Sequence, residues 1–417
     1  MTDTPAEDGT RVRSVPFISR VRLKNYKSIA ECDVRLGPLT ILVGPNGSGK
    51  SNFLDALAFL SRAVATTPAE AIDERGGLRE ILRRVPEQTE SFSAAIEATV
   101  WWGPLPDQKV NASYEFEIGP PARRGIRSFE IVTESCELRW DDQVWRFSAD
   151  RGAAEIESPD QRTESVLFEA DRLYLPVASV QQAFAPLFAG LREMRLYNFE
   201  PEIMRRPQPP TAGAVLGRAG QHLGDVLGAL STGNRSYKQR IDAYLRAVVP
   251  GVSSIEEYHA GQYVTVALEA TTGSGGGEVE FGPASMSDGT IRAAGVLAAL
   301  FQPWVLERRI RLVGIEEPES ALHPAAAGVL FDALTEASGH VQVLATSQSA
   351  DLLDRDDLDV SAIRPVTMTD GLTLIGEVDD ASRENAEKKL YTLGELMRGN
   401  QLAPKLPLTG GATPEQA

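Results

Sequence analysis

The 417-residue sequence has little cysteine and little histidine, with two of the first and four of the second. Cys32 and Cys136 are too few for a disulfide framework, so that class of small, cross-linked protein is excluded. No run of 18 apolar residues occurs, and residues 1–10 lack the apolar core of a signal peptide. Sustained heptads are also missing, which argues against a long coiled-coil arm. We therefore expect a cytoplasmic protein without membrane contact.

The composition that is present is globular and acidic. Hydrophobic residues make up 42% of the chain and charged residues 24%, which predicts folded domains rather than a disordered chain. Lys and Arg number 42 against 58 Asp and Glu, so the formal net charge is −16. Because binding to nucleic acid depends on Lys and Arg, this charge argues against DNA as the default partner. A groove formed locally by two copies could still bind DNA.

The order of predicted elements favours an α/β fold that contains a β-rich segment. Short apolar runs at 39–43, 311–315 and 341–345 predict buried strands of a parallel sheet. They alternate with predicted helices at 51–64, 291–306 and 325–338. Strand patterns also occur at 18–26, 91–102, 112–118, 128–140 and 143–149, the last four predicting an antiparallel meander. Further helices are predicted at 181–194, 221–230 and 237–248, followed by a hairpin of 263–270 and 278–281.

These patterns predict five consecutive regions. Residues 1–13 are expected to be a flexible tail, and residues 401–417 a disordered one. A phosphate-binding lobe is expected at 14–89, and a second lobe at 281–400. Between the lobes, residues 90–280 are predicted to form an inserted β-meander and helical subdomain. Within it, residues 205–210 are rich in proline and are predicted to be a linker.

The clearest motif follows the apolar run at 39–43. Residues 44–51 fit the pattern G-x-x-x-x-G-K-[ST], in which backbone N–H groups surround phosphate oxygens at the start of a helix. Lys50 would contact the β- and γ-phosphates of ATP, and the Ser51 hydroxyl would ligate Mg²⁺. A glycine turn with an incidental lysine is the alternative interpretation. The predicted nucleotide-binding residues are Gly44, Pro45, Asn46, Gly47, Ser48, Gly49, Lys50, Ser51 and Asn52.

Two carboxylates end the apolar run at 311–315. Ligands of open α/β sheets bind at the carboxyl ends of the strands, where Glu316 and Glu317 lie. We expect Glu316 to hold Mg²⁺, and Glu317 to orient and polarise the attacking water as a catalytic residue. The alternative is that both acids merely favour the start of a helix.

A third motif, Met286-Ser-Asp-Gly-Thr290, lies between the other two. Together with Glu316-Glu-Pro-Glu-Ser-Ala-Leu-His-Pro324, Ala345-Thr-Ser-Gln-Ser-Ala-Asp-Leu-Leu353 and Leu23-Lys-Asn-Tyr-Lys-Ser28, it gives an ordered set. The set resembles the RecF/SMC-like ABC-type ATPases of the AAA "predicted ATPase" family, here without a coiled coil or a fused TOPRIM nuclease. The resemblance covers roughly 18–64 and 281–400.

The resemblance implies a P-loop NTPase with an ABC-type head, in which helices flank a mixed sheet. It also implies that ATP is bound between the phosphate loop of one copy and the signature loop of another, so that ATP produces a homodimer. Ser287, Asp288 and Gly289 are the implied signature residues. Taken alone, the motif is weak, because Ser-Asp-Gly is also a common turn and N-cap sequence, and the turn is then the better interpretation.

Several positions depart from the family pattern. Glu316 stands where such ATPases usually have Asp, and Mg²⁺ tolerates either carboxylate. Asp288 would bring a negative charge near phosphates unless it is turned away. Gln348 stands where the family has a switch histidine, and it can donate a hydrogen bond but cannot carry a proton. We therefore assign Gln348 a catalytic contact with the γ-phosphate, and predict intact binding with slow hydrolysis.

Three functions remain open at this stage. The first is an ATPase that acts as a nucleotide-gated switch in DNA repair or in defence against phage and plasmids, together with a separately encoded nuclease or effector protein. The second is a scaffold that dimerises on ATP and hydrolyses little of it. The third is the ATPase subunit of a transporter, which the 234 residues between Ser51 and the signature argue against.

Overall fold

The computed structural model describes residues 16–84, 89–101, 109–122, 128–160, 163–272, 277–355 and 357–405. The predicted tail at 1–13 and residues 406–417 of the predicted second tail lie outside these ranges. Residues 401–405 are placed, however, so that part of the prediction of disorder is wrong. The Lys405 N–H donates to the Glu377 carbonyl at 2.7 Å, and Pro404 forms a bridge with Val378.

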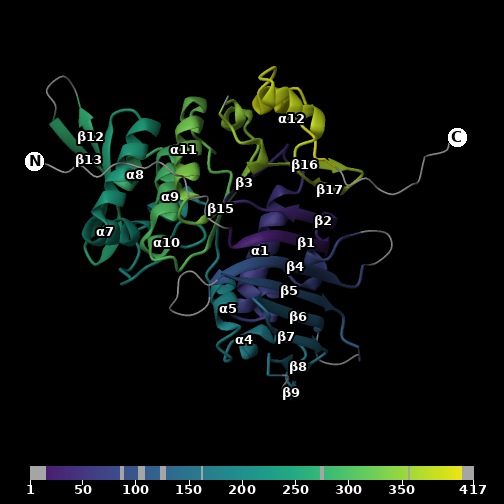
Figure 1. Cartoon of the computed structure of the whole chain (residues 1–417). Helices are drawn as coiled ribbons and strands as arrows, with labels where there is room; N and C mark the ends of the chain where they lie inside the picture. Colours follow the sequence, from purple (N-terminus) through teal and green to yellow (C-terminus); the bar gives the residue numbers. More distant parts are fainter. Residues whose placement is uncertain are drawn as a thin grey trace, which may run out of the picture.

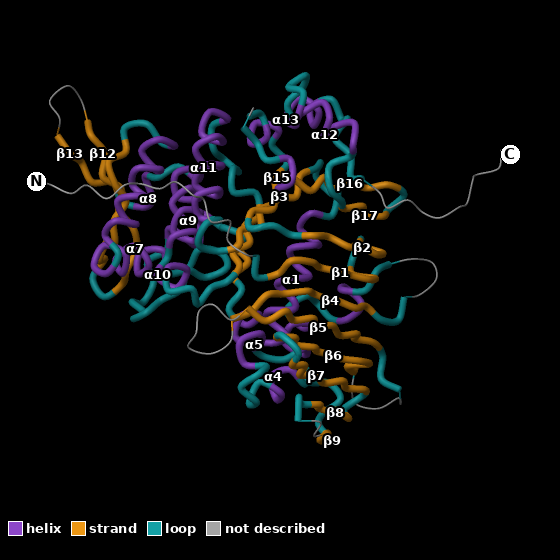
Figure 2. The backbone as a smooth tube through the Cα atoms, in the orientation of Figure 1, coloured by secondary structure: helices purple, strands orange, loops and turns teal. Residues whose placement is uncertain are grey.

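The larger of two main sheets is antiparallel and has eight strands in the order β2-β1-β4-β5-β6-β7-β8-β9. In Figure 2 its strands lie one below another in the lower right half of the molecule. The alternation of buried and exposed residues, complete along β4, explains why these segments form strands with one covered face. The bounds are β1 Ile18–Tyr26, β2 Ile29–Arg35, β4 Phe92–Trp101, β5 Lys109–Gly119, β6 Glu130–Trp140, β7 Gln143–Asp150, β8 Ala153–Glu157 and β9 Thr163–Leu167.

The second sheet has six strands in the order β10-β14-β15-β3-β16-β17. All neighbours are parallel except β16 and β17, so the sheet is mixed, as predicted. β3 lies between β15 and β16, and its apolar residues are almost wholly buried, which places the loop after β3 at the middle of one sheet edge. The bounds are β3 Leu39–Val43, β10 Arg195–Tyr197, β14 Leu312–Glu316, β15 Gln342–Ser347, β16 Ile363–Thr369 and β17 Leu372–Ile375.

Helices cover both sheets, and a small third sheet, β11-β12-β13, adjoins the helices on the left of Figure 1. The helix after β3 is the longest and runs over residues 50–65, as its sequence predicted. The bounds are α1 Lys50–Ala65, α2 Pro68–Asp73, α3 Leu78–Ile81, α4 Leu175–Ala178, α5 Ala185–Arg192, α6 Pro201–Arg205, α7 Leu223–Gly233, α8 Arg235–Val248, α9 Asp288–Phe301, α10 Pro303–Leu306, α11 Ala327–Ala337, α12 Asp380–Glu387 and α13 Leu393–Arg398, with β11 Val252–Ala260, β12 Tyr263–Thr272 and β13 Gly277–Phe281.

The helix predicted at 291–306 is two helices. Gln302 is extended (φ −60°, ψ 155°) and Pro303 begins α10, because the residue before a proline disfavours the helical region. Within the described ranges, Asp288–Leu306 is the one stretch long and apolar enough by length and composition to cross a membrane. The structure buries 78% of it, as is usual for a core helix.

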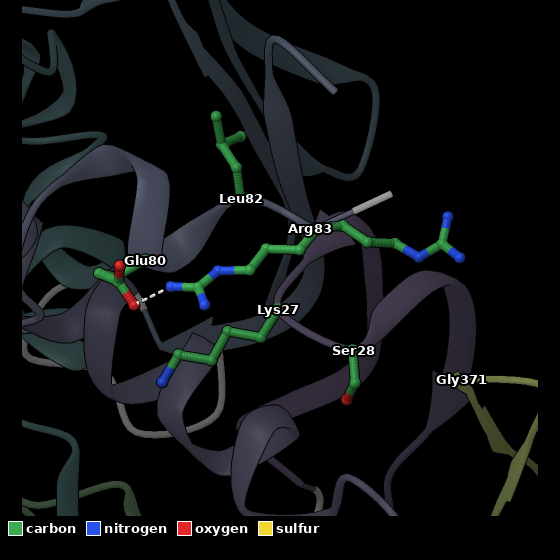
Figure 3. A pocket seen from close by; sticks show the side chains of 7 residues that line it. Lys27, Ser28, Glu80, Leu82, Arg83 and Gly371 are labelled. Atoms are coloured by element: carbon green, nitrogen blue, oxygen red, sulfur yellow. Dashed lines mark hydrogen bonds and ion pairs between the residues drawn. The ribbon is translucent and has the colours of Figure 1, made fainter. Parts of the chain in front are cut away.

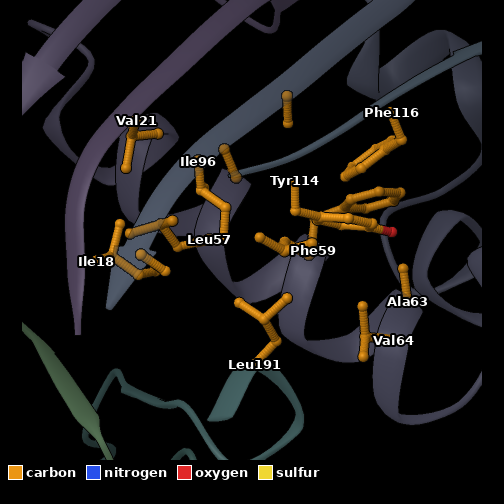
Figure 4. Packing of buried hydrophobic residues seen from close by; sticks show 14 of the residues in the cluster. Ile18, Val21, Leu57, Phe59, Ala63, Val64, Ile96, Tyr114, Phe116 and Leu191 are labelled. Carbon is orange, nitrogen blue, oxygen red and sulfur yellow. The ribbon is translucent and has the colours of Figure 1, made fainter. Parts of the chain in front are cut away.

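The expected boundary at residue 90 is not a boundary. β4 pairs with β1, so that Val21 lies opposite Ile96, and the meander continues the sheet that β1 and β2 begin. Figure 4 shows side chains from β1, α1, β4 and β5 packed in one core, among them Ile96 and Leu57. The helical part of the predicted insert instead shares a second core with the C-terminal lobe, in which Leu227 and Leu245 pack with Leu297. The predicted subdomain is therefore divided between two cores.

The predicted linker at 205–210 is also structured in part. Arg205 ends α6, and Gln208 forms a bridge with Val264, its N–H donating to the Val264 carbonyl at 2.8 Å. Prolines at 207, 209 and 210 prevent a regular strand, but one bridge is sufficient to fix the segment against β12.

One buried side chain joins the two main sheets. Gln342, at the start of β15, accepts a hydrogen bond from the Ile18 N–H at 2.8 Å, and donates to the carbonyls of Ile18 (2.7 Å) and Gly37 (2.9 Å). Its amide therefore satisfies both backbone groups of the first residue of β1.

We expect Gln342→Ala to lower the free energy of unfolding by about 3 kcal/mol, because it leaves these buried backbone groups without partners. Urea denaturation followed by circular dichroism measures the effect. Gln143→Ala, at an exposed position of β7, is the matched control and should change stability by less than about 0.5 kcal/mol. Equal stability of both variants would show that the amide does not join the sheets.

Candidate functional site

The predicted motifs meet at one edge of the six-stranded sheet. β3, β15 and β14 are parallel neighbours, with Val43 paired to Ser347 and Thr346 paired to Glu316. Their carboxyl ends therefore lie side by side, and the loops that follow carry Lys50, Glu317 and Gln348. Residues far apart in the sequence are brought together because parallel strands present their ends at a common edge.

The phosphate loop is a tight turn between β3 and α1. Gly49 has φ +103°, a conformation that suits glycine, and a Cβ there would lie 2.1 Å from Thr373 Oγ1. Pro45, Asn46 and Gly47 are exposed, whereas Ser48 is buried. The loop thus turns its first half toward solvent and packs its second half against β17.

Lys50 is buried, with 5% of its surface exposed, and its ammonium group folds back over the loop. Nζ donates to the carbonyl oxygens of Gly44 at 2.7 Å and Pro45 at 2.9 Å. Burial lowers the pKa of Lys50, and the negative charges of Glu317 and Glu319 act in the opposite direction. A cation is therefore held at the centre of the loop, facing the acidic residues after β14.

Two features of this loop fit a bound phosphate. The Ser48 hydroxyl is buried and, within the described ranges, has no hydrogen-bond partner. A Cβ at Gly47 would meet no atom within 4 Å, so space is open above the loop. A phosphate oxygen is an acceptor that would satisfy both Ser48 and the backbone N–H groups of such a loop.

The predicted metal-ligating residues lie close together. The Ser51 hydroxyl lies near the carboxylate of Glu316, the last residue of β14, closely enough to act on its pKa. Burial raises the pKa of Glu316, and the Ser51 hydroxyl and the positive charge of Arg218 oppose the rise. Within the described ranges no group of three or more His, Cys, Asp or Glu could hold a metal ion. A hydroxyl and one carboxylate leave most of the Mg²⁺ coordination to phosphate and water, as Mg²⁺ prefers.

Glu317 is held in an unusual backbone conformation. Its φ is +44°, and its N–H donates to the carbonyl of Thr346 at 3.1 Å. Its carboxylate Oε2 accepts hydrogen bonds from Ser320 Oγ at 3.1 Å and from Gln348 Nε2 at 3.0 Å. A non-glycine residue in the left-handed region is uncommon, and strained backbone of this kind occurs often at functional sites. Gln348 therefore contacts the predicted catalytic carboxylate directly.

Glu319 belongs to the site and was not predicted. Only 8% of its surface is exposed; its Oε1 accepts a hydrogen bond from Ser347 Oγ at 2.5 Å. Its other oxygen has no partner within the described ranges, and burial raises its pKa. The sequence did carry a signal, since Glu319 is the third acid of the run that begins at Glu316.

The predicted signature residues cap α9. The Ser287 hydroxyl accepts from the Thr290 N–H at 3.1 Å, so this serine is a helix N-cap. This is the structure that the alternative interpretation of the motif, a turn and helix N-cap, also predicts. Asp288 pairs with Arg205, a residue that sequence reasoning treated as linker. The negative charge of Asp288 is therefore neutralised within the chain.

Gly289 is required by a close approach within the same chain. A Cβ at this position would lie 2.3 Å from the carbonyl oxygen of Ala321, in the loop that follows Glu317. The helix that follows the predicted signature is thus packed against the loop that carries Glu317. A movement of one would be transmitted to the other by direct contact.

Asn52 does not point its amide at the phosphate loop. Its Nδ2 donates to Ser28 Oγ at 2.6 Å, and Ser28 also shares a hydrogen bond with Thr373 at 2.7 Å.

Ser28 and Lys27 line a pocket of about 310 Å³ beside the start of α1. Figure 3 shows it between Lys27 and Gly371, with an ion pair between Glu80 and Arg84 at its rim. Lys27 itself pairs with Asp55 of α1 at 2.5 Å.

Comparison with known proteins gives local matches to DNA replication and repair proteins and to a nuclease. The chain is 39% identical over 62 residues to the DNA replication and repair protein RecF of Magnetococcus marinus, and 53% identical over 63 residues to that of Porphyromonas gingivalis. It is 34% identical over 90 residues to the OLD nuclease of Thermus scotoductus. These matches cover 14%, 14% and 21% of this chain, and 16%, 17% and 15% of those relatives. The chain thus spans less than a fifth of their length.

Among solved structures, the chain is similar to an Smc head bound to the C-winged helix domain of ScpA. The TM-score is 0.49 at 15% identity, and the match covers 86% of this chain and 97% of that one. A second match is the Smc head domain of Pyrococcus furiosus with an extended coiled coil, at a TM-score of 0.48 and 13% identity, covering 90% and 100%.

A family model described as "AAA domain, putative AbiEii toxin, Type IV TA system" matches residues 39–354. This range includes the phosphate loop, Glu316, Glu317, the signature residues and Gln348. The chain belongs to this AAA family.

Proposed function

We propose that the chain binds and hydrolyses ATP with Mg²⁺, and that ATP joins two copies head to head. The observation that carries this proposal is the contact between Gln348 and Glu317 opposite the buried Lys50. A cation and an acid–amide pair on neighbouring loops suit a γ-phosphate and an attacking water. When bound, Mg²⁺ would neutralise phosphate charge next to Ser51 and Glu316.

Each residue has a defined task in this proposal. Lys50 would exchange its contacts with the Gly44 and Pro45 carbonyls for phosphate oxygens. Glu317 would accept a hydrogen bond from the attacking water, and Gln348 would hold that carboxylate while donating its other amide hydrogen to the γ-phosphate. The pocket of Lys27 and Ser28 offers room for the ribose and base of the nucleotide.

The signature residues are proposed to act on the second copy. The Ser287 hydroxyl accepts from the Thr290 N–H and shares a hydrogen bond with Thr290 Oγ1 at 2.8 Å; when Thr290 donates in that bond, the Ser287 hydrogen is available to a phosphate. The Gly289 N–H lies in the first turn of α9, where the helix dipole favours an anion. Arg205 neutralises Asp288, so the main electrostatic objection to this site is removed. ATP would then be enclosed by two symmetric surfaces, as in a closed two-fold dimer.

We further propose that this ATP-dependent dimer is a switch in DNA repair or in defence against phage and plasmids, working in the cytoplasm with a separately encoded nuclease or effector. The support is the local identity to proteins named for DNA replication and repair and to a nuclease, and a family description that includes a toxin–antitoxin system. Binding to DNA by the chain itself is part of the same proposal.

Size-exclusion chromatography with light scattering tests the dimer. Glu317→Gln keeps the shape of the side chain but slows hydrolysis, so the variant should elute as a monomer without nucleotide and as a dimer with ATP and Mg²⁺. A monomer under both conditions, in a sample shown to bind ATP, would reject the two-copy site. Adding a DNA duplex to the same samples tests DNA binding.

A scaffold that dimerises with little turnover is the second candidate function, and Gln348 favours it because an amide cannot carry a proton.

We expect Gln348→Ala to reduce phosphate release about tenfold, since one hydrogen bond to the Glu317 carboxylate and one to the γ-phosphate are lost. Gln401→Ala, outside the site, is the control. Unchanged release in Gln348→Ala would remove the proposed contact with the γ-phosphate, and background release by the unsubstituted chain would support the scaffold.

A further inference from the structure

A second pocket lies at the opposite edge of the six-stranded sheet from the phosphate loop. Arg311 immediately precedes β14, whereas Glu316 ends it, so about 16 Å of strand separates the two. The pocket has a volume of about 310 Å³, and it is lined by arginines and aromatic rings from β4, α5 and the segment between α10 and β14. We call it the arginine pocket; its key residues are Phe17, Trp101, Arg192, Arg308, Arg309 and Arg311.

The arginine pocket carries excess positive charge in a chain of net charge −16. Four arginines line it against one acid, Glu193, which already pairs with Arg192 at 3.1 Å and with Arg195 at 2.6 Å. Arg309 lies 3.9 Å from Glu307. Within the described ranges, neither Arg308 nor Arg311 has a carboxylate within ion-pair distance.

Arg311 has the least favourable electrostatic environment of these arginines. It is partly buried, and its guanidinium lies 4.9 Å from the centre of the Trp101 ring. Burial and then the positive charge of Arg308 lower its pKa. A half-buried arginine next to another arginine costs stability unless an anion compensates it. Among the described residues no carboxylate compensates it, so its guanidinium is available to an anionic ligand.

The volume of the arginine pocket and the aromatic side chains beside its arginines indicate which kind of anion it would bind. Arg309 stacks on Trp304, with 3.3 Å from its guanidinium carbon to the ring centre, so its planar group is held in a fixed orientation. Fixed guanidinium groups bind phosphate through two parallel hydrogen bonds. A volume of about 310 Å³ exceeds what a lone phosphate fills, and the partly exposed Trp101, Pro186 and Ala189 add apolar surface suited to a ring.

We propose that the arginine pocket binds a nucleotide-type ligand, with its phosphate on Arg308 and Arg311 and its base against the apolar part of the lining. Two sources share this chemistry: a free mononucleotide, and the 5′-phosphorylated end of a nucleic-acid strand. The pocket is separate from the proposed ATP site, so the inference stands whether or not the chain hydrolyses ATP.

The test is isothermal titration calorimetry on the full chain carrying Lys50→Ala, which removes the central cation of the phosphate loop. AMP, inorganic phosphate, and a short oligothymidylate with and without a 5′-phosphate are the four probes. We expect AMP to bind, and to bind more tightly than inorganic phosphate. Tighter binding of the 5′-phosphorylated strand than of AMP would identify a strand end as the ligand, and the reverse order a free nucleotide.

Arg311→Gln in the same chain should weaken AMP binding at least tenfold, while its thermal unfolding midpoint stays equal or rises because a half-buried like-charge contact is removed. Arg146→Gln is the matched control, since Arg146 is exposed on β7 and pairs with Glu157. Raising the salt concentration from 50 to 300 mM should weaken binding in the parent chain. No binding of AMP, equal binding by Arg311→Gln, or equal affinity for AMP and inorganic phosphate would overturn the proposal.

Discussion

Phosphate release should fall about 10²- to 10⁴-fold when Glu317 is replaced by Gln, while ATP binding is retained. Oε2 of Glu317 accepts from Ser320 and Gln348, which leaves Oε1 as the oxygen that can accept a hydrogen bond from water. An amide of the same shape keeps one acceptor oxygen but lacks the negative charge that polarises the water. A coupled phosphate-release assay, together with a fluorescent-nucleotide titration, measures both effects.

The control for this prediction is Glu278→Gln, an exposed position of β13 remote from the phosphate loop. Its rate should equal that of the unsubstituted chain. If Glu317→Gln released phosphate at the same rate as well, another group would have to activate the water. Glu319 would then be the next candidate, because it is buried and its second oxygen has no partner among the described residues.

Lys50→Ala should remove ATP binding, with a loss of affinity of about a hundredfold or more, since truncating one partner of a buried charge pair costs roughly 2–5 kcal/mol. In the structure the ammonium is the one cation that donates to the carbonyls of Gly44 and Pro45, at the centre of the phosphate loop. Without it, the carboxylates of Glu317 and Glu319 would face the phosphates without compensation. Calorimetric titration with a non-hydrolysable ATP analogue measures the loss.

Lys24→Ala is the matched control, because Lys24 is an exposed lysine of β1 that contacts only Glu31 among the acids that the structure places, at 3.5 Å. Its affinity for the analogue should be unchanged. Full affinity in Lys50→Ala would show that the motif at residues 44–51 is a structural turn, and the proposed ATP site would fail with it. The arginine pocket would remain to be judged by its own titration.

The parts of the site that could be predicted from sequence are those whose geometry is local. A phosphate loop is defined by glycine spacing between a strand and a helix, and residues 44–51 carry all of that information. Glu316 and Glu317 were identified because a buried strand and the residue after it share one sheet edge. Helix α1 and strands β3, β14 and β15 followed from short periodic patterns for the same reason.

The parts that could not be predicted depend on contacts between distant segments. Nothing in residues 92–101 indicates that they pair with β1, so the meander was assigned to a separate subdomain. The charge of Asp288 could not be weighed without knowing that Arg205, 83 residues away, compensates it. Likewise, a net charge is a sum over the chain, and it conceals four arginines that two segments bring to one pocket.

The pairing of β4 with β1 has a consequence for how the chain can be shortened. An inserted domain can usually be excised because both of its ends lie at a surface, but here excision would remove the neighbour of β1 and expose its whole hydrogen-bonding edge. Shortening from β9 inward would only move an edge that already exists. The antiparallel sheet can therefore vary in width at its far end, whereas its first three strands form one unit with the nucleotide-binding fold.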